Sequence, residues 1–584
     1  MKSIVTNAAG ITVLRLIDNT LKTGGGPVSI GATVIQAQKG PVGKVCQVNY
    51  QTWETVFGKP YSKTIADRTQ MEGLRHLNDA AKECIYVNAV RVVSADAAFP
   101  SLEILVTQDK DAWTQTTPYV VGDVVAITGP AKLICVTAHT SSSTEPTSAA
   151  TEWDAFESPV EKSNHSYGTP IAAETGYLCS IYPIDGDPCL NRSFKITAVN
   201  TDKERFTIQF FDKDERGIEY LLEYWTVGVN PLDKDDMGRS VFIETILEER
   251  SVRFRCDWNV SNDWADAIGS INAVAELATK TTFEGGSNGG VPTTQEWIAA
   301  WDMFRSEAVT AYLMFAAGCY DMDVLQNCID IAELRHTMFF LDVPCYQNQS
   351  VISGWISSAA FDTRFAAAYH CPIAANDEWY GGKTIWGASG AVVAACANGD
   401  ANYSGETPGI HYSPAGRIRG RLSRTAIEFI YPEDVVDRDA LVELRINPIV
   451  PGPTGGAIID DALTLNSLEN YSRFVWVNRI ANYIDYRFLE MASQLQHEPD
   501  RLTADGLTRG MTKILGDLVI SGALSPPRSM FTASPYSVNA YAATDTNPYV
   551  FLVTQPEIDR WLVEWSFCPT GSARRIVGQP IMVL

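Results

Sequence analysis

Basic residues are in the minority in this chain. Its 584 residues include 46 Lys and Arg but 69 Asp and Glu, which gives a formal net charge of −23. Binding nucleic acid or an anionic membrane surface requires clustered Lys and Arg side chains that neutralise phosphates. We therefore expect no nucleic acid and no membrane surface among the partners of this protein.

Long hydrophobic runs are also missing. The most apolar stretch, residues 308–320, lies between Glu307 and Asp321, and it is too short to cross a bilayer but suits a buried strand or helix. Lys2 is not followed by the apolar run of a secretory signal. We expect a protein without a membrane anchor that is made in the cytosol and leaves it only by a route that needs no signal.

The 12 cysteines form no C-x-x-C pair, and most of them have apolar neighbours, as Cys84 and Cys396 do. In a reducing compartment this pattern is typical of small buried hydrophobic residues and argues against a metal site or a disulfide framework.

Known catalytic and phosphate-binding patterns are incomplete. GGKT at 381–384 resembles the end of a phosphate-binding loop, but Asp377 stands where that pattern needs glycine. GASGA at 387–391 resembles a nucleophile elbow, but Ala391 replaces its final glycine. The seven histidines form no H-E-x-x-H motif. The sequence therefore predicts no catalytic residue, no metal site and no cofactor, as in a protein that is not an enzyme.

Two acidic turns partly match a calcium-binding loop. The first is Asp212, Asp214, Gly217 and Glu223, and the second is Asp233, Asp235, Gly238 and Glu244. Arg216 and Met237 occupy the fifth position, where calcium needs an oxygen ligand. The strand patterns on either side favour simple hairpin turns.

What the sequence does contain is an interrupted α/β pattern. Residues 28–48 predict two strands around a Gly-Pro turn, 52–57 a short helix, 65–83 a longer helix and 84–93 a strand buried on both faces. Residues 95–260 have few helix patterns and many turns, which indicates a β-rich insertion. After it, 264–279, 295–304 and 322–335 predict helices, the second of them capped by Thr293 or Thr294, and 308–318 and 337–344 predict buried strands.

The C-terminal part predicts a mixture of helices and strands. The helix candidates are 480–491 and 502–520, and the strand candidates are 463–465, 474–477, 549–553 and 560–567. Extended segments stand at both ends of the chain, at 3–18 and at 574–584, and three consecutive glycines, Gly24 to Gly26, follow the first of them.

In order along the chain, these landmarks resemble the tail sheath proteins of contractile bacteriophages. The resemblance lies in IGATVIQAQKGPVGKVCQVNYQTWETVFGKP, LRHLNDAAKECIYVNAVRV, ATKTTFEGGSNGGVPTTQEWIAAWDMF, ELRHTMFFLDVP, WGASGAVVAACANGD, INPIV and YSRFVWVNRIANYIDYRFLE. The chain departs from the family pattern at Ala388, where a proline is usual, and in the loosely matching segment HEPDRLTADGLTRGM.

The resemblance implies a multidomain α/β (mixed α+β) fold: a sheath-like core with an inserted β-rich domain and extended N- and C-terminal arms. The domains are predicted as an N-terminal arm and joint (1–27), a core (28–94 and 261–440), the insertion (95–260), a C-terminal α+β domain (441–571) and a C-terminal arm (572–584).

The resemblance also implies a function. A sheath subunit polymerises as stacked six-fold rings around a tail tube and contracts to drive the tube through the host envelope. Its partners would be other copies of itself, the tail tube protein, the baseplate and the tail terminator, and it would be assembled in the host cytoplasm and reside in the virion. The arms would add strands to neighbouring subunits through Ile11, Val13, Leu16, Ile576, Val577, Ile581 and Val583. The candidate tube-facing residues are Arg509 and Lys513, on the polar face of the helix at 502–520.

A second resemblance lies inside the insertion. Residues 113–153 are similar to a small chitin-binding-type module, with Trp113, Tyr119, Gly122-Asp123, a strand that ends at Cys135, His139-Thr140-Ser141 and Trp153. Trp113, Tyr119 and Trp153 either contact a glycan, because aromatic faces stack on sugar rings, or form the small core of the module. Two alternatives to a sheath therefore remain: a virion protein that binds a glycan receptor, and an enzyme whose site the sequence does not reveal.

Overall fold

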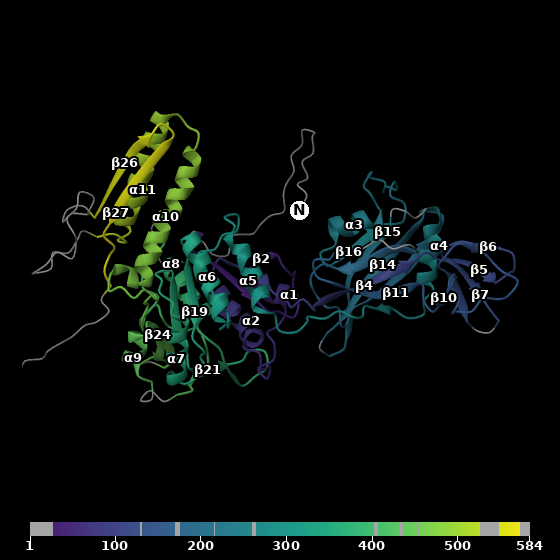
Figure 1. Cartoon of the computed structure of the whole chain (residues 1–584), viewed down its shortest axis with the longest axis horizontal. Coiled ribbons are helices and arrows are strands. Elements are labelled where there is room, and N and C mark those ends of the chain that lie inside the picture. The colour runs from purple at the N-terminus through teal and green to yellow at the C-terminus, as the bar shows by residue number, and fades with distance from the viewer. Residues whose placement is uncertain are drawn as a thin grey trace, which may run out of the picture.

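The computed structural model describes residues 27–128, 131–169, 176–214, 216–259, 264–401, 407–431, 436–453, 455–525 and 548–572. The chain forms a row of bodies, with a C-terminal helical module at one end, an α/β core in the middle and the β-rich insertion at the other end (Figure 1). The predicted arm residues Ile11, Val13, Leu16, Ile576, Val577, Ile581 and Val583 lie outside the described residues.

The core is built on an eight-stranded sheet in the order β2-β3-β1-β18-β19-β20-β24-β25. The six inner strands are parallel, and the two edge strands are antiparallel to their neighbours. The strands are β1 (Ile30–Ile35), β2 (Val45–Val48), β3 (Tyr86–Arg91), β18 (Leu313–Phe315), β19 (Met338–Asp342), β20 (Ala366–His370), β24 (Ile446–Pro451) and β25 (Ala457–Ile459). β1, β19 and β20 are buried along their whole length, as expected of parallel strands covered on both faces.

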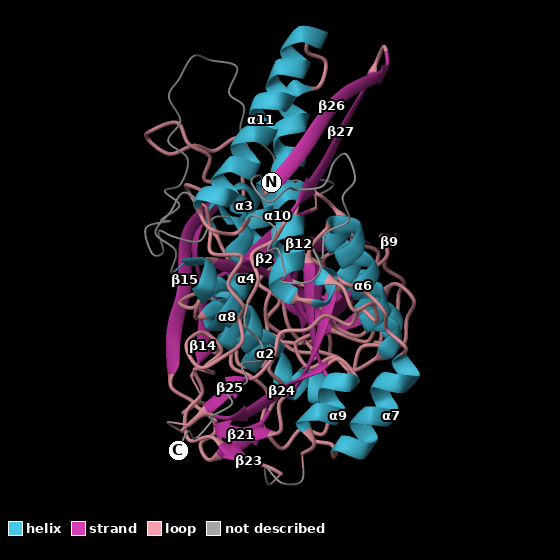
Figure 2. Cartoon of the chain, turned by 90° about the vertical axis from the view of Figure 1, so that its left-hand side faces the viewer, coloured by secondary structure: helices cyan, strands magenta, loops and turns pink. Residues whose placement is uncertain are grey.

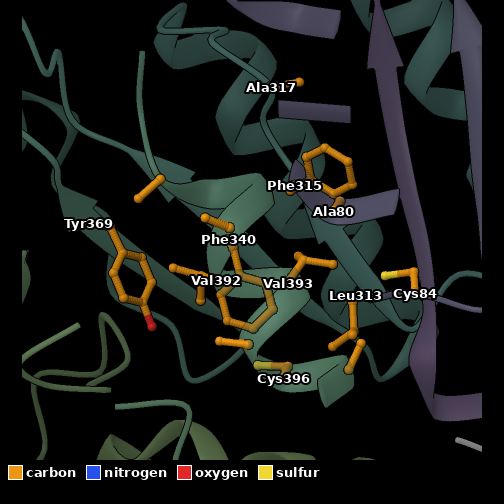
Figure 3. Packing of buried hydrophobic residues seen from close by; sticks show 14 of the residues in the cluster. Ala80, Cys84, Leu313, Phe315, Ala317, Phe340, Tyr369, Val392, Val393 and Cys396 are labelled. Atoms are coloured by element: carbon orange, nitrogen blue, oxygen red, sulfur yellow. The ribbon is translucent and has the colours of Figure 1, made fainter. Parts of the chain in front are cut away.

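Helices cover both faces of this sheet. One face packs against α1 (Trp53–Phe57), α2 (Arg68–Ala81) and α8 (Ser389–Ala401). The other packs against α5 (Thr294–Asp302), α6 (Met322–Arg335), α7 (Gln349–Ala359) and α9 (Arg438–Glu443). Figure 3 shows the first core, where Phe315, Phe340 and Tyr369 of the sheet meet Val392 and Val393 of α8. The predicted α/β core is confirmed.

Local signals explain where several core helices begin. Asp67 caps α2 by accepting a hydrogen bond from the backbone of Thr69, and Asp321 caps α6 in the same way. Thr293 and Glu296 form a reciprocal capping box at the start of α5. A small sheet of β22 (Lys383–Ile385), β21 (Ile373–Asn376) and β23 (Glu428–Phe429) lies beside the core.

The insertion consists of two four-stranded sheets around a core of its own. The first sheet contains β11 (Val160–Ser166), β4 (Ala98–Leu105), β12 (Tyr177–Pro183) and β16 (Phe254–Trp258). The second contains β15 (Glu219–Gly228), β14 (Arg205–Lys213), β13 (Ser193–Asn200) and β17 (Thr281–Thr282), and the helix α3 (Ile243–Arg250) packs on this body. The predicted β-rich character is confirmed.

The insertion extends beyond the boundary predicted at residue 260. Helix α4 (Trp264–Ala275) was assigned to the core by its helical pattern, but its Ala267, Ile271 and Val274 are buried in the core of the insertion. Strand β17 pairs with β13, within the same body. The sequence pattern identified the helix but carried no information on which apolar core would cover it.

A smaller body is attached to the insertion at residues 108–156. It contains a four-stranded sheet of β10 (Trp153–Phe156), β8 (Lys132–Cys135), β7 (Asp123–Ala126) and β5 (Gln108–Ala112), and a short pair of β6 (Pro118–Tyr119) and β9 (His139–Thr140). Its core is a separate small cluster. We call this body the small module.

The C-terminal module is a pair of long helices, α10 (Val475–Leu495) and α11 (Asp500–Ile520), with the hairpin of β26 (Tyr549–Glu557) and β27 (Arg560–Phe567) lying along them (Figure 2). Two predictions are corrected here. Residues 474–477 form no strand, because α10 begins at Val475 and buries Val475, Trp476 and Val477 against the core. Residues 446–459 belong to the core sheet as β24 and β25, and not to the C-terminal module.

Polar contacts fasten the C-terminal module to the core. Arg479 of α10 forms a buried ion pair with Asp400 of α8, at 2.5 Å, and Ser29 donates a hydrogen bond to the same carboxylate. Within the described ranges, none of the helices combines the length and the hydropathy that a membrane crossing demands.

Candidate functional site

The hairpin β26–β27 is a two-stranded sheet whose outer edges pair with no other described strand. Tyr549, Phe551, Val563 and Trp565 on one face pack against α10 and α11, and on the other face Leu552 and Leu562 remain more than one-third exposed. An isolated two-stranded sheet is only marginally stable, and unpaired edges are templates for further strands. The hairpin can therefore accept strands from other segments.

The two predicted tube-facing residues lie one helical turn apart on α11. Arg509 and Lys513 are both exposed, whereas Leu507, Met511 and Ile514 of the same helix are buried against α10 and the hairpin. Neither cation has an ion-pair partner among the described residues. The structure thus places both side chains on an open face, as the helical pattern predicted, and both are available to an anionic partner.

Arg91, the last residue of β3, fastens the insertion to the core. Its guanidinium is fully buried and donates to the backbone oxygens of Ala37, Gly40 and Gly186, at 2.7–3.1 Å, and to the side chain of Asn288, at 2.6 Å. Burial lowers the pKa of Arg91. Because Gly186 belongs to the insertion and Ala37 and Gly40 to the core, one side chain joins the two bodies where the chain passes between them.

The glycine-rich segment at 283–290 brings the chain back from the insertion to this same joint. A Cβ atom on Gly286 would lie 2.0 Å from the backbone oxygen of Pro188, and one on Gly289 would lie 2.3 Å from Ser94 Oγ. Glycine is therefore required at residues 286 and 289 for this returning segment to pack against Pro188 and Ser94. The glycines and the proline of 283–292 predict a turn, and the family resemblance includes this segment, but nothing in the sequence predicts its contact with Arg91.

A buried polar cluster lies between α2 and the start of α8. Ser389 Oγ is 3.2 Å from His76 Nδ1, and His76 Nε2 is 3.3 Å from Glu72 Oε2. Asp342 accepts hydrogen bonds from the backbone N–H groups of Ala388 and Ser389. Burial raises the pKa of Asp342, whereas for Glu72 the His76 and Arg68 contacts outweigh burial and hold the pKa below its ordinary value.

The order serine–histidine–carboxylate in this cluster resembles a nucleophile with its base and orienting acid. However, the Ser389, His76 and Glu72 side chains are all completely buried, so a substrate cannot approach the hydroxyl. The cluster instead satisfies the N–H groups at the start of α8 and ties this helix to α2 and β19. Ser389, the serine of the incomplete nucleophile-elbow segment GASGA, is thus part of a structural network.

The aromatic residues of the small module face its interior. Tyr119 is 3% exposed and Trp153 is 2% exposed, and their rings form an edge-to-face pair with centroids 5.1 Å apart. Trp113 packs against the same cluster and is half-buried. Tyr119 and Trp153 are therefore core residues of the module. Their rings are not available to stack on a sugar.

The two acidic turns are held by arginines and backbone groups. Asp214 accepts hydrogen bonds from the backbone of Arg216 and Ile218 in the turn between β14 and β15, and Asp233 pairs with Arg205 at 2.7 Å. The hairpin turn predicted for the first segment is confirmed, because it joins β14 to β15. The hairpin predicted for the second is wrong: this segment leads from β15 into helix α3, which contains Glu244. In the part of the chain that the structure describes, no group of three or more His, Cys, Asp or Glu side chains is placed to hold a metal ion.

The sequence matches no protein-family model and no curated protein. Among solved structures, the sheath tail protein from Desulfitobacterium hafniense is similar with a TM-score of 0.46 and 12% identity, over 96% of this chain and 100% of that chain. The sheath of the PVC extracellular contractile injection system in its contracted state is similar with a TM-score of 0.37 and 17% identity, over 46% and 70%. The contracted helical sheath of the anti-feeding prophage gives 0.36 and 15%, over 52% and 77%. These are similarities of fold only.

Proposed function

We propose that this protein is the structural subunit of a contractile tail sheath. It polymerises as stacked six-fold rings around a tail tube, and rigid-body rearrangement of the subunits drives the tube through the host envelope. Its partners are other copies of itself, the tail tube protein, the baseplate and the tail terminator. It is assembled in the host cytoplasm and resides in the virion.

The observation that carries this proposal is the unpaired hairpin β26–β27. Its outer edges accept no strand from the described residues, and the chain carries apolar, strand-forming segments at both ends, around Val13 and around Val577. Strands added from neighbouring copies would bind through backbone hydrogen bonds, which require no particular side-chain chemistry. Such links keep rings connected while the bodies rotate, which is what a contracting lattice needs.

The ordered sequence resemblance and the lack of a recognisable active-site motif support the same proposal. A sheath does its work by changing from one lattice of self-contacts to a tighter one, so that its free energy lies in subunit packing. The row of separate bodies in Figure 1 suits such a change, because each body has its own apolar core and keeps its shape as the contacts between copies change.

Removal of the N-terminal arm tests the proposal. We expect a variant that lacks residues 1–20 to remain a folded monomer but to form no sheath polymers, because the strand that joins it to the next copy is gone. Electron microscopy and size-exclusion chromatography measure polymers, and circular dichroism measures folding. Polymers of normal length from this variant would exclude the arm as the connecting element.

A matched pair of substitutions separates backbone pairing from side-chain contact. Val13→Pro removes an N–H donor and Val13→Ala keeps it, so we expect proline to suppress polymers more strongly than alanine. Equal polymer yields from the two variants would contradict pairing at this residue.

Charge reversal on α11 tests the contact with the tail tube. We expect Arg509→Glu with Lys513→Glu to weaken co-sedimentation with the purified tube protein at least about ten-fold at low salt, because two unpaired cations become anions. The control is Lys203→Glu with Arg250→Glu, which changes the net charge equally on two exposed residues of the insertion. Tube binding that is equal in both variants would place the contact elsewhere.

A further inference from the structure

A cavity of about 640 Å³ separates the small module from helix α4. Residues of β5 and β7 of the small module line one side of it, and residues of α4 line the other. Figure 1 shows α4 next to these strands. Ser270 of α4 accepts a hydrogen bond from the backbone N–H of Thr107, at 2.9 Å, and donates one to the oxygen of Thr107, at 3.3 Å, directly before β5. The two walls are thus hydrogen-bonded to each other where they meet, so that the cleft exists before any ligand arrives, as is usual for small-molecule sites.

Both apolar and hydrogen-bonding groups line this cleft. Phe156 and Ile268 are half-buried, and Val120 is 55% exposed. The amide side chains of Gln108 and Asn272 line the same space and offer both donors and acceptors. A ligand that fits such a lining has apolar faces together with several hydroxyl or amide groups.

Three carboxylates and one lysine line the cleft, and two of the carboxylates have a lysine partner. Asp109 forms an ion pair with Lys132 at 2.8 Å, and Asp123 lies 3.6 Å from the Nζ atom of Lys110. Glu276 accepts a hydrogen bond from Asn272, one turn away on α4, at 3.0 Å. With Asp109 and Asp123 each beside a lysine, only Glu276 adds a negative charge without a cation beside it among the described residues; this charge disfavours an anion, and the polar lining suits an uncharged ligand.

Two buried oxygen atoms of lining residues have no hydrogen-bond partner among the described residues. They are Oδ1 of Asp123, whose side chain is 2% exposed, and Oγ1 of Thr107. Buried polar atoms in proteins are nearly always hydrogen-bonded. Both atoms lie behind the surface of the cleft, so a ligand hydroxyl group would reach them only through a water molecule.

We propose that this cleft is a binding site for a neutral oligosaccharide, roughly the size of a di- or trisaccharide. Sugar rings present apolar C–H faces to Phe156 and Ile268 and hydroxyl groups to Gln108 and Asn272. The site differs from the one the sequence suggested, because it lies between two bodies and does not use the buried rings of Tyr119 and Trp153. It does not depend on the sheath function and would act on the assembled particle or on a free subunit.

Saturation-transfer NMR and calorimetric titration of the full chain with maltotriose, cellotriose and triacetylchitotriose test the proposal. We expect at least one of the three to bind. Gln108→Ala with Asn272→Ala should weaken that binding at least ten-fold, and Ala273→Trp should block it, because residue 273 lines the cleft.

The matched control is Gln115→Ala with Gln326→Ala. Both residues are exposed amides outside the cleft, and Gln326 bonds to Asp330 one turn away just as Asn272 bonds to Glu276. We expect binding as in the wild type, with thermal melting confirming that all variants are folded. The proposal is overturned if none of the three sugars binds, or if the cleft variants bind as tightly as the control.

Discussion

His370, at the end of β20, is a buried histidine in the core. It is 1% exposed, and neither ring nitrogen has a hydrogen-bond partner among the described residues. Burial disfavours the charged imidazolium and lowers the pKa of His370 to about 4. The unfolded chain, in which the pKa is about 6.5, binds the proton first as the pH falls. Stability from this residue is therefore present above pH 6.5 and is lost progressively towards pH 4.

We expect His370→Asn to make the free energy of unfolding less dependent on pH. Relative to the variant, the wild type should lose about 2 kcal/mol between pH 7.5 and pH 5, as follows from the two pKa values. Urea unfolding of both proteins at the two pH values measures this difference.

Two other buried groups, His411 and Asp400, titrate in the same pH range. The difference between the wild type and His370→Asn separates the effect of His370 from theirs. Burial lowers the pKa of His411 to about 4 and raises the pKa of Asp400 to about 6, so that their effects on stability have opposite signs. Both are present in wild type and variant and cancel in the difference. His497→Asn, at an exposed histidine, is the control, and an equal change in it would contradict the assignment to His370.

For single residues, the sequence indicated which side chains matter but not always whether they are buried or what they contact. Tyr119 and Trp153 were recognised as a module signature, and their alternative as core residues was retained. The decision between ring stacking on a sugar and core packing depended on burial, which only the folded chain has. The partners of Arg91 were not predictable, because Gly186 and Asn288 are 95 and 197 residues away.

At the scale of elements, α2 and α8 approach each other unusually closely. A Cβ atom on Gly390 would lie 2.2 Å from the backbone oxygen of His76 and 2.9 Å from its Cα atom. Because these are backbone atoms, no side-chain rotation relieves the clash. The glycine thus sets the distance between two helices that share the buried cluster of Ser389, His76 and Glu72.

We expect Gly390→Ala to destabilise the core by about 2–3 kcal/mol, since the overpacking outweighs the gain of up to about 1 kcal/mol in helix propensity. Differential scanning calorimetry measures the shift of the core transition. Gly399→Ala on the same helix is the control, because its Cβ would meet nothing within 4 Å, and it should be neutral or slightly stabilising. A Gly390 variant that melts like this control would show that the helices can separate without cost.

Element predictions succeeded where periodicity and caps agreed. Residues 322–335 and the capped helix after Thr293 were identified from local pattern alone, because capping and helical spacing are local properties. The strand predicted at residues 474–477 was wrong, because an apolar run of four residues suits a strand and the first turn of a buried helix equally well.

At the scale of the whole molecule, Arg91 couples the insertion to the core. Its donors reach three backbone oxygens and one amide oxygen on both sides of the joint. Replacing it leaves these buried acceptors unpaired, which costs more than the bonds themselves contribute. The two bodies should then separate more readily without either of them unfolding.

We expect Arg91→Met to accelerate proteolytic cleavage within the connecting segments 92–97 and 283–292 by about ten-fold, which corresponds to roughly 1.4 kcal/mol. Limited proteolysis with mass spectrometry identifies the cut sites. Arg250→Met, at an exposed arginine of the insertion, should leave the rate unchanged. Unchanged cleavage in the Arg91 variant would mean that the glycine segment alone holds the joint.

The net charge of −23 also acts on the whole molecule. Like charges on separate copies repel one another, which keeps subunits soluble before they assemble. The exposed cations Arg509 and Lys513 stand apart from this acidic background, and this is why their helix is the part of the surface we propose for the tail tube.

The sequence by itself determined the α/β core, the position of the β-rich insertion and the long C-terminal helices, because hydrophobic periodicity and capping residues act over a few neighbours. The tertiary structure alone decided that α4 belongs to the insertion, that β24 and β25 belong to the core, that Tyr119 and Trp153 are buried, and that a cleft lies beside α4. Each of these depends on which distant surfaces meet, and the free energy of burial favours contact without specifying, in any short segment, the partner that provides it.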